Sequence, residues 1–149
     1  PWKTQEWMNK ILTKPIIQRY GTHGFLQNPV FDKVYKATPD GYLEEMDDDY
    51  GCMSSWFAMG AMGIFQYCPG QPVYQLFSPV FDKIIIQLEN NKVLKIEAKG
   101  LTPESFYIKS ATFNGIPYKK SNIPHEDLMK GGELQFIMTS KPNKRWGTD

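Results

Sequence analysis

The sequence has almost no excess charge and no long apolar run. Its 17 lysines and arginines stand against 16 aspartates and glutamates, a net charge of +1, so no long-range field attracts nucleic acid or an anionic membrane surface. The basic pairs Lys119-Lys120 and Lys144-Arg145 are therefore interpreted as solvated faces. No stretch reaches the roughly 20 apolar residues that a membrane-spanning helix needs. We expect neither a nucleic-acid partner nor a membrane span.

Cysteine and histidine are also scarce, with two of each. If residues 52 to 66 are helical, Cys52 and Cys68 lie roughly 20 Å apart, well beyond the roughly 4.4–6.8 Å between Cα atoms that a disulfide allows. We predict that they do not pair and that both are small apolar packing residues. His23 and His125 have no G-x-S-x-G, P-loop or H-E-x-x-H motif beside them, so serine-triad, nucleotide and zinc chemistry are disfavoured and both are interpreted as surface or structural histidines.

The chain has 149 residues, of which 41% are hydrophobic, which is enough for one compact domain. It begins at Pro1 without an initiator methionine or a signal-like segment, which suggests a processed or truncated product. Residues 3 to 13 predict a short helix with Thr4 as its cap. The segment that follows is irregular, with short helical turns expected at residues 16–20 and 30–35.

An apolar helix is predicted from about residue 51 to residue 66. It carries no charge and is apolar on every side, which predicts burial all round. Gly60 and Gly63 would each cost roughly 1 kcal/mol relative to alanine, so we expect another backbone to approach closely there. Pro69-Gly70 marks the one candidate boundary in the chain.

Short β-rich runs follow this boundary. Asn114-Gly115 is a strong hairpin signal, and residues 89–91 predict a turn between two neighbouring strands. A single helical turn is expected at residues 125–128. The predicted strands cover residues 73–77, 83–88, 92–98, 106–113, 116–118 and 133–139. The predicted fold class is α+β, with a helical segment followed by an antiparallel β-rich region of roughly five or six strands.

Three consecutive acids, Asp47, Asp48 and Asp49, stand before the apolar helix. They do not form an EF-hand calcium loop, because Ala58 occupies the position of the closing glutamate. Asp47 and Asp49, two apart in an extended segment, would point to similar sides and could orient and deprotonate a water molecule. In inverting glycoside hydrolysis such a base works opposite a carboxylic acid roughly 6.5–9.5 Å away. The alternative is a solvated helix start, with Asp49 or Tyr50 near the cap.

The informative stretches of the chain are, in order, PWKTQEW, DDDYGCMSSWFAMGAMGIFQYCPG, PVYQLFSPVFDKIIIQL, YIKSATFNG, HEDLMKGGELQF and PNKRWG. Together they resemble the C-terminal part of the glycoside hydrolase family 92 α-mannosidases. The similarity runs over nearly the whole chain, except for residues 14 to 40, which resemble a family-variable insertion.

The resemblance implies that residues 1–69 are the C-terminal helices of an (α/α)6-barrel catalytic domain, and that residues 70–149 are an antiparallel β region packed on it. It implies a calcium-dependent, inverting exo-α-mannosidase that hydrolyses α-mannosides of glycans, α-1,2-linked ones first. Members are typically secreted, periplasmic or at the cell surface. The remainder of the catalytic domain is then missing from this chain, and the fragment could self-associate.

A family motif close to G-D-E-D-x-G-x-M-S-A-W aligns with the acids before the apolar helix. By this resemblance Asp49 is the general base and Asp47 is its partner, whereas calcium ligands stay unassigned. Met46 replaces the usual glycine and Asp48 the usual glutamate, which allows a different loop shape. A second family stretch near the active site, and hence near the substrate, corresponds to Trp2, Lys3, Thr4 and Gln5. The alternative is that these residues only start a helix.

The resemblance places the general-acid glutamate before Pro1. The chain alone should therefore lack half of the acid–base pair and be inactive. A rival hypothesis is a non-catalytic carbohydrate-binding or interaction module, in which exposed Tyr107, Tyr118 and Trp146 on the sheet contact the ligand.

Overall fold

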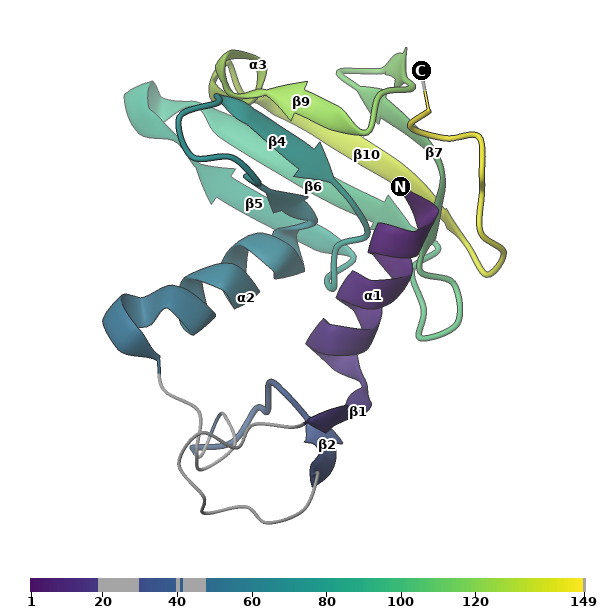
Figure 1. The fold of residues 1–149 in the computed structure, drawn as a ribbon. Coiled ribbons are helices and arrows are strands. Elements are labelled where there is room, and N and C mark those ends of the chain that lie inside the picture. The colour runs from purple at the N-terminus through teal and green to yellow at the C-terminus, as the bar shows by residue number, and fades with distance from the viewer. Residues whose placement is uncertain (19–29, 40, 42–47, 149) are drawn as a thin grey trace.

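The structure is a computed structural model that describes residues 1–18, 30–39, 41 and 48–148 (Figure 1). His23, Met46 and Asp47 lie outside the described residues. The helices are α1 (Trp2–Thr13), α2 (Cys52–Met62) and α3 (His125–Met129), with short 3-10 turns η1 (Asp49–Gly51) and η2 (Glu89–Asn91). The strands are β1 (Pro15–Gln18), β2 (Val30–Lys33), β3 (Ile64–Phe65), β4 (Val73–Leu76), β5 (Lys83–Gln87), β6 (Val93–Lys99), β7 (Tyr107–Phe113), β8 (Ile116–Tyr118), β9 (Asn122–Pro124) and β10 (Gly132–Thr139).

The largest sheet has five strands in the order β5-β6-β10-β7-β8. Strand β10 inserts between β6 and β7, so it runs parallel to β6 and antiparallel to β7. The other pairs in this sheet are antiparallel. The predicted α+β class is confirmed, with an antiparallel β-rich region after a helical segment. The β6–β10 pair is the exception, because β10, which follows α3 in the chain, enters the middle of the sheet and runs in the same direction as β6.

Two smaller sheets complete the fold. Strands β3, β4 and β9 form one, and β1 and β2 form a two-stranded ladder in which Pro15 lies opposite Lys33. The helical turns predicted at residues 16–20 and 30–35 are therefore wrong. Ile16, Ile17 and Val30 are β-branched and suit a strand pair better than a helix.

The helices differ from their predicted limits for local reasons. Pro1 is the N-cap of α1, so Thr4 lies inside the helix and the predicted cap is wrong. Helix α2 stops at Met62, four residues before the predicted end, because Gly63 takes a left-handed backbone with φ 78°. A β-carbon on Gly63 would lie 2.7 Å from the Phe77 carbonyl oxygen and 2.9 Å from the Pro79 nitrogen. The predicted close approach of another backbone is thus confirmed at this position.

Helix α2 is much less buried than its composition predicts. Only Gly60 and Ala61 of this helix are buried, with Gly60 against Met8 and Leu12 of α1. Cys52 and Cys68 are unpaired, as predicted, but both are exposed, so their predicted packing role is wrong. The exposure of α2 and of both cysteines has the same reason: the described part of this chain has too few elements to surround this helix. Within that part, no helix is long and apolar enough to cross a membrane.

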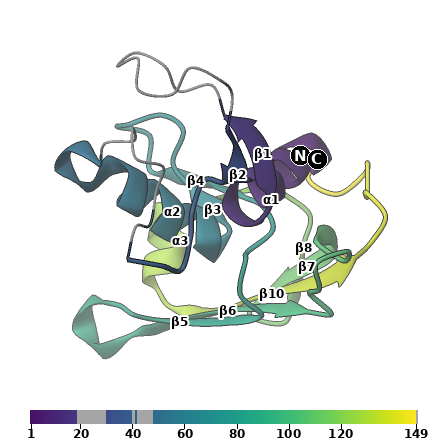
Figure 2. The ribbon, with the colours of Figure 1, turned by 90° about the horizontal axis from the view of Figure 1, so that it is seen from below.

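The core lies between the inner face of the five-stranded sheet and the layer above it. Figure 2 shows α1, α2, α3 and the smaller sheets on one side of the large sheet. Strands β6 and β10 alternate in burial, with Ile96 and Phe136 fully inside. The tail packs on this core through Trp146, whose ring meets Phe136 edge-on at 6.4 Å.

Burial takes two of the three aromatic side chains named in the rival binding-module hypothesis out of the exposed surface. Tyr107 and Trp146 are buried, at 9% and 6% exposure, and Tyr118 is half-buried. The Trp146 indole donates a hydrogen bond to the Tyr118 carbonyl oxygen at 3.2 Å. The predicted exposure of these aromatics is therefore wrong, because β7 turns Tyr107 inward and the tail folds over the sheet.

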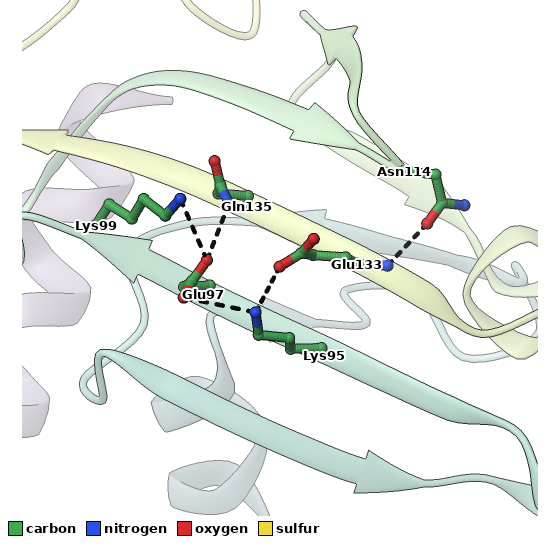
Figure 3. A network of polar contacts seen from close by, with 6 residues as sticks. All are labelled: Lys95, Glu97, Lys99, Asn114, Glu133 and Gln135. Atoms are coloured by element: carbon green, nitrogen blue, oxygen red, sulfur yellow. Dashed lines mark hydrogen bonds and ion pairs between the residues drawn. The ribbon is translucent and has the colours of Figure 1, made fainter.

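The outer face of the sheet carries a ladder of charged side chains across the parallel pair (Figure 3). Lys95 on β6 lies opposite Glu133 on β10 and bonds its carboxylate at 2.6 Å. Glu97 lies opposite Gln135 and accepts from its amide at 2.9 Å. The hydrogen bond with Glu133 raises the pKa of Lys95. A slip of one residue would turn every one of these groups toward the core, so the ladder reinforces the register.

Candidate functional site

The candidate acids lie on a tight turn at the start of α2. Tyr50 has φ 55° and ψ 22°, and Gly51 follows with φ 73° and ψ 21°. A left-handed conformation is unfavourable for a residue with a β-carbon, by roughly 1–2 kcal/mol. Tyr50 nevertheless adopts it while its side chain is fully exposed. Two left-handed residues in succession reverse the chain direction between the acids and the helix.

Because the chain reverses here, the side chain of Asp48 reaches the first turn of α2 and caps the helix. One carboxylate oxygen, Oδ1, accepts from the Met53 backbone N–H at 2.7 Å and from the Ser54 N–H at 3.1 Å. The other oxygen, Oδ2, accepts from the Ser54 hydroxyl. Gly51, at the N-cap position, has no side chain to do this. The Ser54 hydroxyl, followed by its backbone N–H, lowers the pKa of Asp48, and the positive end of the helix favours the same charge. The cap is therefore Asp48, not Asp49 or Tyr50.

Asp49 lies on the same turn with its side chain exposed. Among residues 1–18, 30–39, 41 and 48–148, no hydrogen bond or ion pair reaches its carboxylate. Asp49 begins the 3-10 turn rather than continuing an extended strand, so the predicted extended geometry is wrong at this residue. Asp47 lies outside the described residues, and the pairing of the two acids stays a prediction.

The other predicted site residues form the first turn of α1. The Gln5 side chain is 1% exposed, and its Oε1 accepts from the Ile108 backbone N–H at 2.7 Å. Two ammonium groups lie near the Trp2 ring, with the Nζ atoms of Lys3 and Lys144 each 5.7 Å from its centre. Lys3 is exposed and Thr4 is half-buried. These residues do start a helix, and their predicted contact with substrate stays a prediction.

The two predicted groups do not meet within this chain. The first turn of α1 lies beside the tail, where Pro1 approaches Gly147, and Figures 1 and 2 show the first turn of α2 at the opposite side of the molecule. The two helices touch further along, where Met8 and Leu12 pack on Gly60. In the described residues the turn before α2 and the first turn of α1 therefore lie apart.

A cavity that the sequence did not predict lies next to this turn. It has a volume of about 770 Å³ and lies between α1, α2 and residues 33–41. Ser54, the partner of Asp48, lines it together with Tyr35 and Phe57. Tyr35 stacks on the neighbouring Trp56 at 6.0 Å and donates to the Met53 carbonyl oxygen at 3.4 Å. Nothing in the irregular residues 30–41 signalled this packing, because it depends on side chains of a distant helix.

Calcium prefers six to eight oxygen ligands, mainly carboxylates and carbonyls. The described part of the chain contains no group of three or more histidine, cysteine or acidic side chains that could hold a metal ion. Both carboxylate oxygens of Asp48 already serve the start of α2. These residues do not fit a calcium site by themselves, so the predicted calcium dependence stays a prediction.

The known proteins that this chain resembles are glycoside hydrolases. The chain is 33% identical over 105 residues to an uncharacterized secreted glycosidase of Arthroderma benhamiae, an alignment that covers 68% of this chain and 13% of the relative. All of this chain superposes on 21% of the GH92 family glycosyl hydrolase CcMan5, with a TM-score of 0.93 and 32% identity.

Two solved proteins of Bacteroides thetaiotaomicron are also similar over the whole chain. One is a family GH92 α-mannosidase with a TM-score of 0.80 and 27% identity, and the other is a family GH92 inverting mannosidase with a TM-score of 0.80 and 30% identity. The chain covers 17% of each. Residues 18–140 match the model of the glycosyl hydrolase family 92 catalytic domain. The chain belongs to this family, as the resemblance indicated, and it spans about a fifth or less of the length of these relatives.

Proposed function

We propose that this chain is the C-terminal part of an inverting exo-α-mannosidase and supplies its general base, Asp49. Membership of glycosyl hydrolase family 92 supports glycoside hydrolysis. Similar structures described as an α-mannosidase and an inverting mannosidase support the substrate and the stereochemistry. The substrate class is α-mannosides of glycans, with α-1,2 linkages as the first candidates. A relative described as secreted supports an exported enzyme.

The observation that carries the proposal is the division of roles on the turn before α2. Asp48 is committed to the helix by three hydrogen bonds. Asp49, one residue further, is exposed on a backbone that these bonds hold in a fixed shape. A carboxylate that is positioned by the backbone and open to solvent is suited to accept a proton from water.

In the proposed reaction Asp49 takes a proton from a water molecule while the oxygen of that water attacks the anomeric carbon. A carboxylic acid on the other face donates a proton to the departing glycosidic oxygen, so charge and protons balance. The resemblance puts that acid before Pro1, outside this chain. Asp47 is the proposed partner of Asp49. No step is assigned to calcium, because the described residues offer it no ligand set.

The proposed domain division follows from the same assignment. Residues 1–69, with α1 and α2, belong to the helical barrel, and residues 70–149 form the β region packed on it. The exposed apolar surface of α2 supports a larger domain, because a helix without charge is stable in water only when other elements cover it. We expect the chain alone to release no mannose from an α-1,2-mannobioside.

The test replaces Asp49 by asparagine in the complete enzyme that contains this chain. Asp49→Asn keeps the size of the side chain and removes the base, so kcat/KM for the mannobioside should fall by about 10²- to 10⁴-fold with folding intact. Asp47→Asn should also abolish measurable hydrolysis. Asp127→Asn, an acid on α3 paired with Lys130 at 2.8 Å, is the matched control and should leave kcat/KM unchanged.

Stereochemistry gives a second readout. Proton NMR of the reaction should show β-mannose as the first product, because an inverting enzyme converts an α-linkage into the β-anomer. Full activity in both Asp49→Asn and Asp47→Asn would rule out these residues as the base, whatever the anomer released.

A further inference from the structure

A small basic pocket lies at the C-terminal end of the molecule, away from the turn before α2. Its volume is about 360 Å³, and it lies between β7, β8 and the tail. Three of the side chains that line it are basic: Lys109 of β7, Lys119 after β8, and Arg145 of the tail. Figures 1 and 2 show the tail beside β7, on the opposite side of the molecule from the start of α2.

A bulge in the sheet positions Lys109. Along β10, Ile137 lies opposite Ser110 and Met138 lies opposite Ile108, so Lys109 is an extra residue without a partner in this pairing. A bulge redirects a side chain and frees the backbone beside it. The freed Lys109 carbonyl oxygen accepts from the Asn143 side-chain amide at 2.7 Å. The bulge is thus the point at which the tail attaches to β7.

Further hydrogen bonds fix the backbone of the tail around Arg145. The Asn143 Oδ1 atom accepts from the Arg145 backbone N–H at 3.0 Å. The Trp146 indole donates to the Tyr118 carbonyl oxygen, and the Gly147 N–H donates to the Lys119 carbonyl oxygen at 3.0 Å. The backbone that carries each basic side chain is therefore held in place before any ligand binds, so binding needs to order only the side chains.

The charge of this pocket is not balanced from within. No acidic side chain lines it in the part of the chain that the structure describes, and none of its three basic groups forms an ion pair with a described residue. Like charges that converge without a counter-charge repel one another, and a bound anion relieves that repulsion. Arginine adds a planar pair of donors that matches a carboxylate or phosphate.

We propose that this pocket binds an anionic saccharide through a carboxylate or phosphate group on the sugar. Its volume suits a ligand of about one sugar ring. Ser110 offers a hydroxyl group to sugar hydroxyls, and Pro117 offers an apolar wall to the C–H face. Because the chain belongs to a glycoside hydrolase family, a glycan is the polymer we expect at this surface. The pocket lies on the opposite side of the described molecule from Asp49, so we assign it the binding of acidic glycan chains and no part in proton transfer to Asp49.

The test measures binding of trigalacturonate, a carboxylated trisaccharide, to the complete enzyme by isothermal titration calorimetry at low salt. Arg145→Gln and Lys109→Gln should each weaken binding by roughly tenfold, as expected for loss of one charged hydrogen bond. Lys83→Gln, an exposed lysine on β5, removes the same charge elsewhere and should change binding less than twofold. Asn143→Ala keeps every charge but releases the tail, and it should also weaken binding.

Three further ligands complete the test. The methyl ester of trigalacturonate, which has the same backbone without charge, should not bind. Inorganic phosphate and vesicles of phosphatidylglycerol should bind more weakly than the saccharide, and equal or tighter binding of either would overturn the saccharide assignment. Equal trigalacturonate affinity in wild type and Arg145→Gln would overturn the site itself. Binding is read without hydrolysis, so the result stands independently of the proposed mannosidase activity.

Discussion

The hydrogen bond from the Ile108 backbone to Gln5 predicts a large local effect from a single substitution. The Gln5 side chain is 1% exposed, and its Oε1 atom accepts from the Ile108 N–H at 2.7 Å across 103 positions of sequence. Gln5→Met keeps the length and most of the volume of the side chain but removes this acceptor. The Ile108 N–H, inside the core at 0% exposure, would then have no partner in its present position.

The free-energy cost of Gln5→Met follows from the one donor that it leaves unsatisfied, the Ile108 N–H. The Ser78 hydroxyl also lies near Gln5 Oε1, at 3.4 Å, but its single proton is already directed to the Phe106 carbonyl oxygen. Losing Gln5 therefore costs Ser78 little. A buried N–H left unsatisfied costs about 1–3 kcal/mol, so opening of the start of β7 should become about 5- to 150-fold more frequent.

Hydrogen–deuterium exchange of β7 peptides in the complete enzyme measures this opening directly. Gln5→Met should speed exchange at the Ile108 amide, whereas Lys3→Met, at an exposed position in the same turn, should leave it within about twofold. Unchanged exchange at Ile108 together with a large loss of kcat/KM would refute the reasoning. That outcome would instead show that Gln5 acts on the substrate, as its place in the PWKTQ stretch implied.

Two further predictions concern the backbone and the helix cap. Gly63→Ala should destabilise the fold by at least about 2 kcal/mol, because a left-handed backbone and two close backbone atoms both oppose a β-carbon. The control Gly70→Ala, at a position with φ 90° and open space around it, should cost only about 1 kcal/mol. Equal losses of stability for the two variants in urea unfolding would contradict this account. The pKa of Asp48 is lowered below its usual 3.8, so its charge adds stability that is present above about pH 4 and lost as the pH falls through the folded pKa. The stability difference between wild type and Asp48→Asn should therefore shrink below about pH 4, and a difference that stays constant down to pH 2 would argue against the charged cap.

The elements that the sequence predicted well are those that local interactions define. Asn114 and Gly115 both have positive φ, at 52° and 78°, as a tight hairpin between β7 and β8 requires. Strands β5 and β6 pair across the predicted turn at residues 89–91. In each case the residues that determine the geometry lie within a few positions of one another.

The candidate site shows where the sequence was insufficient. Residue type and order identified the acids, but three consecutive aspartates offered no way to tell which one caps α2. That choice depends on the left-handed backbone at Tyr50 and Gly51, which lets Asp48 reach Met53 and Ser54. Conversely, the apolar composition of α2 predicted a burial that the described residues do not provide, because they place few elements around this helix.

Taken alone, the sequence determined the class of fold and most strands, since these follow from periodicity and turn residues, and its resemblance to known sequences identified the family and pointed to the candidate acids. Only the tertiary structure decided that β10 lies between β6 and β7, that Gln5 satisfies Ile108, and that the basic residues converge. Lys119 and Arg145 looked like separate solvated faces because a net charge of +1 averages over positions. Distance in space determines electrostatic interaction, and only folding brings those charges together.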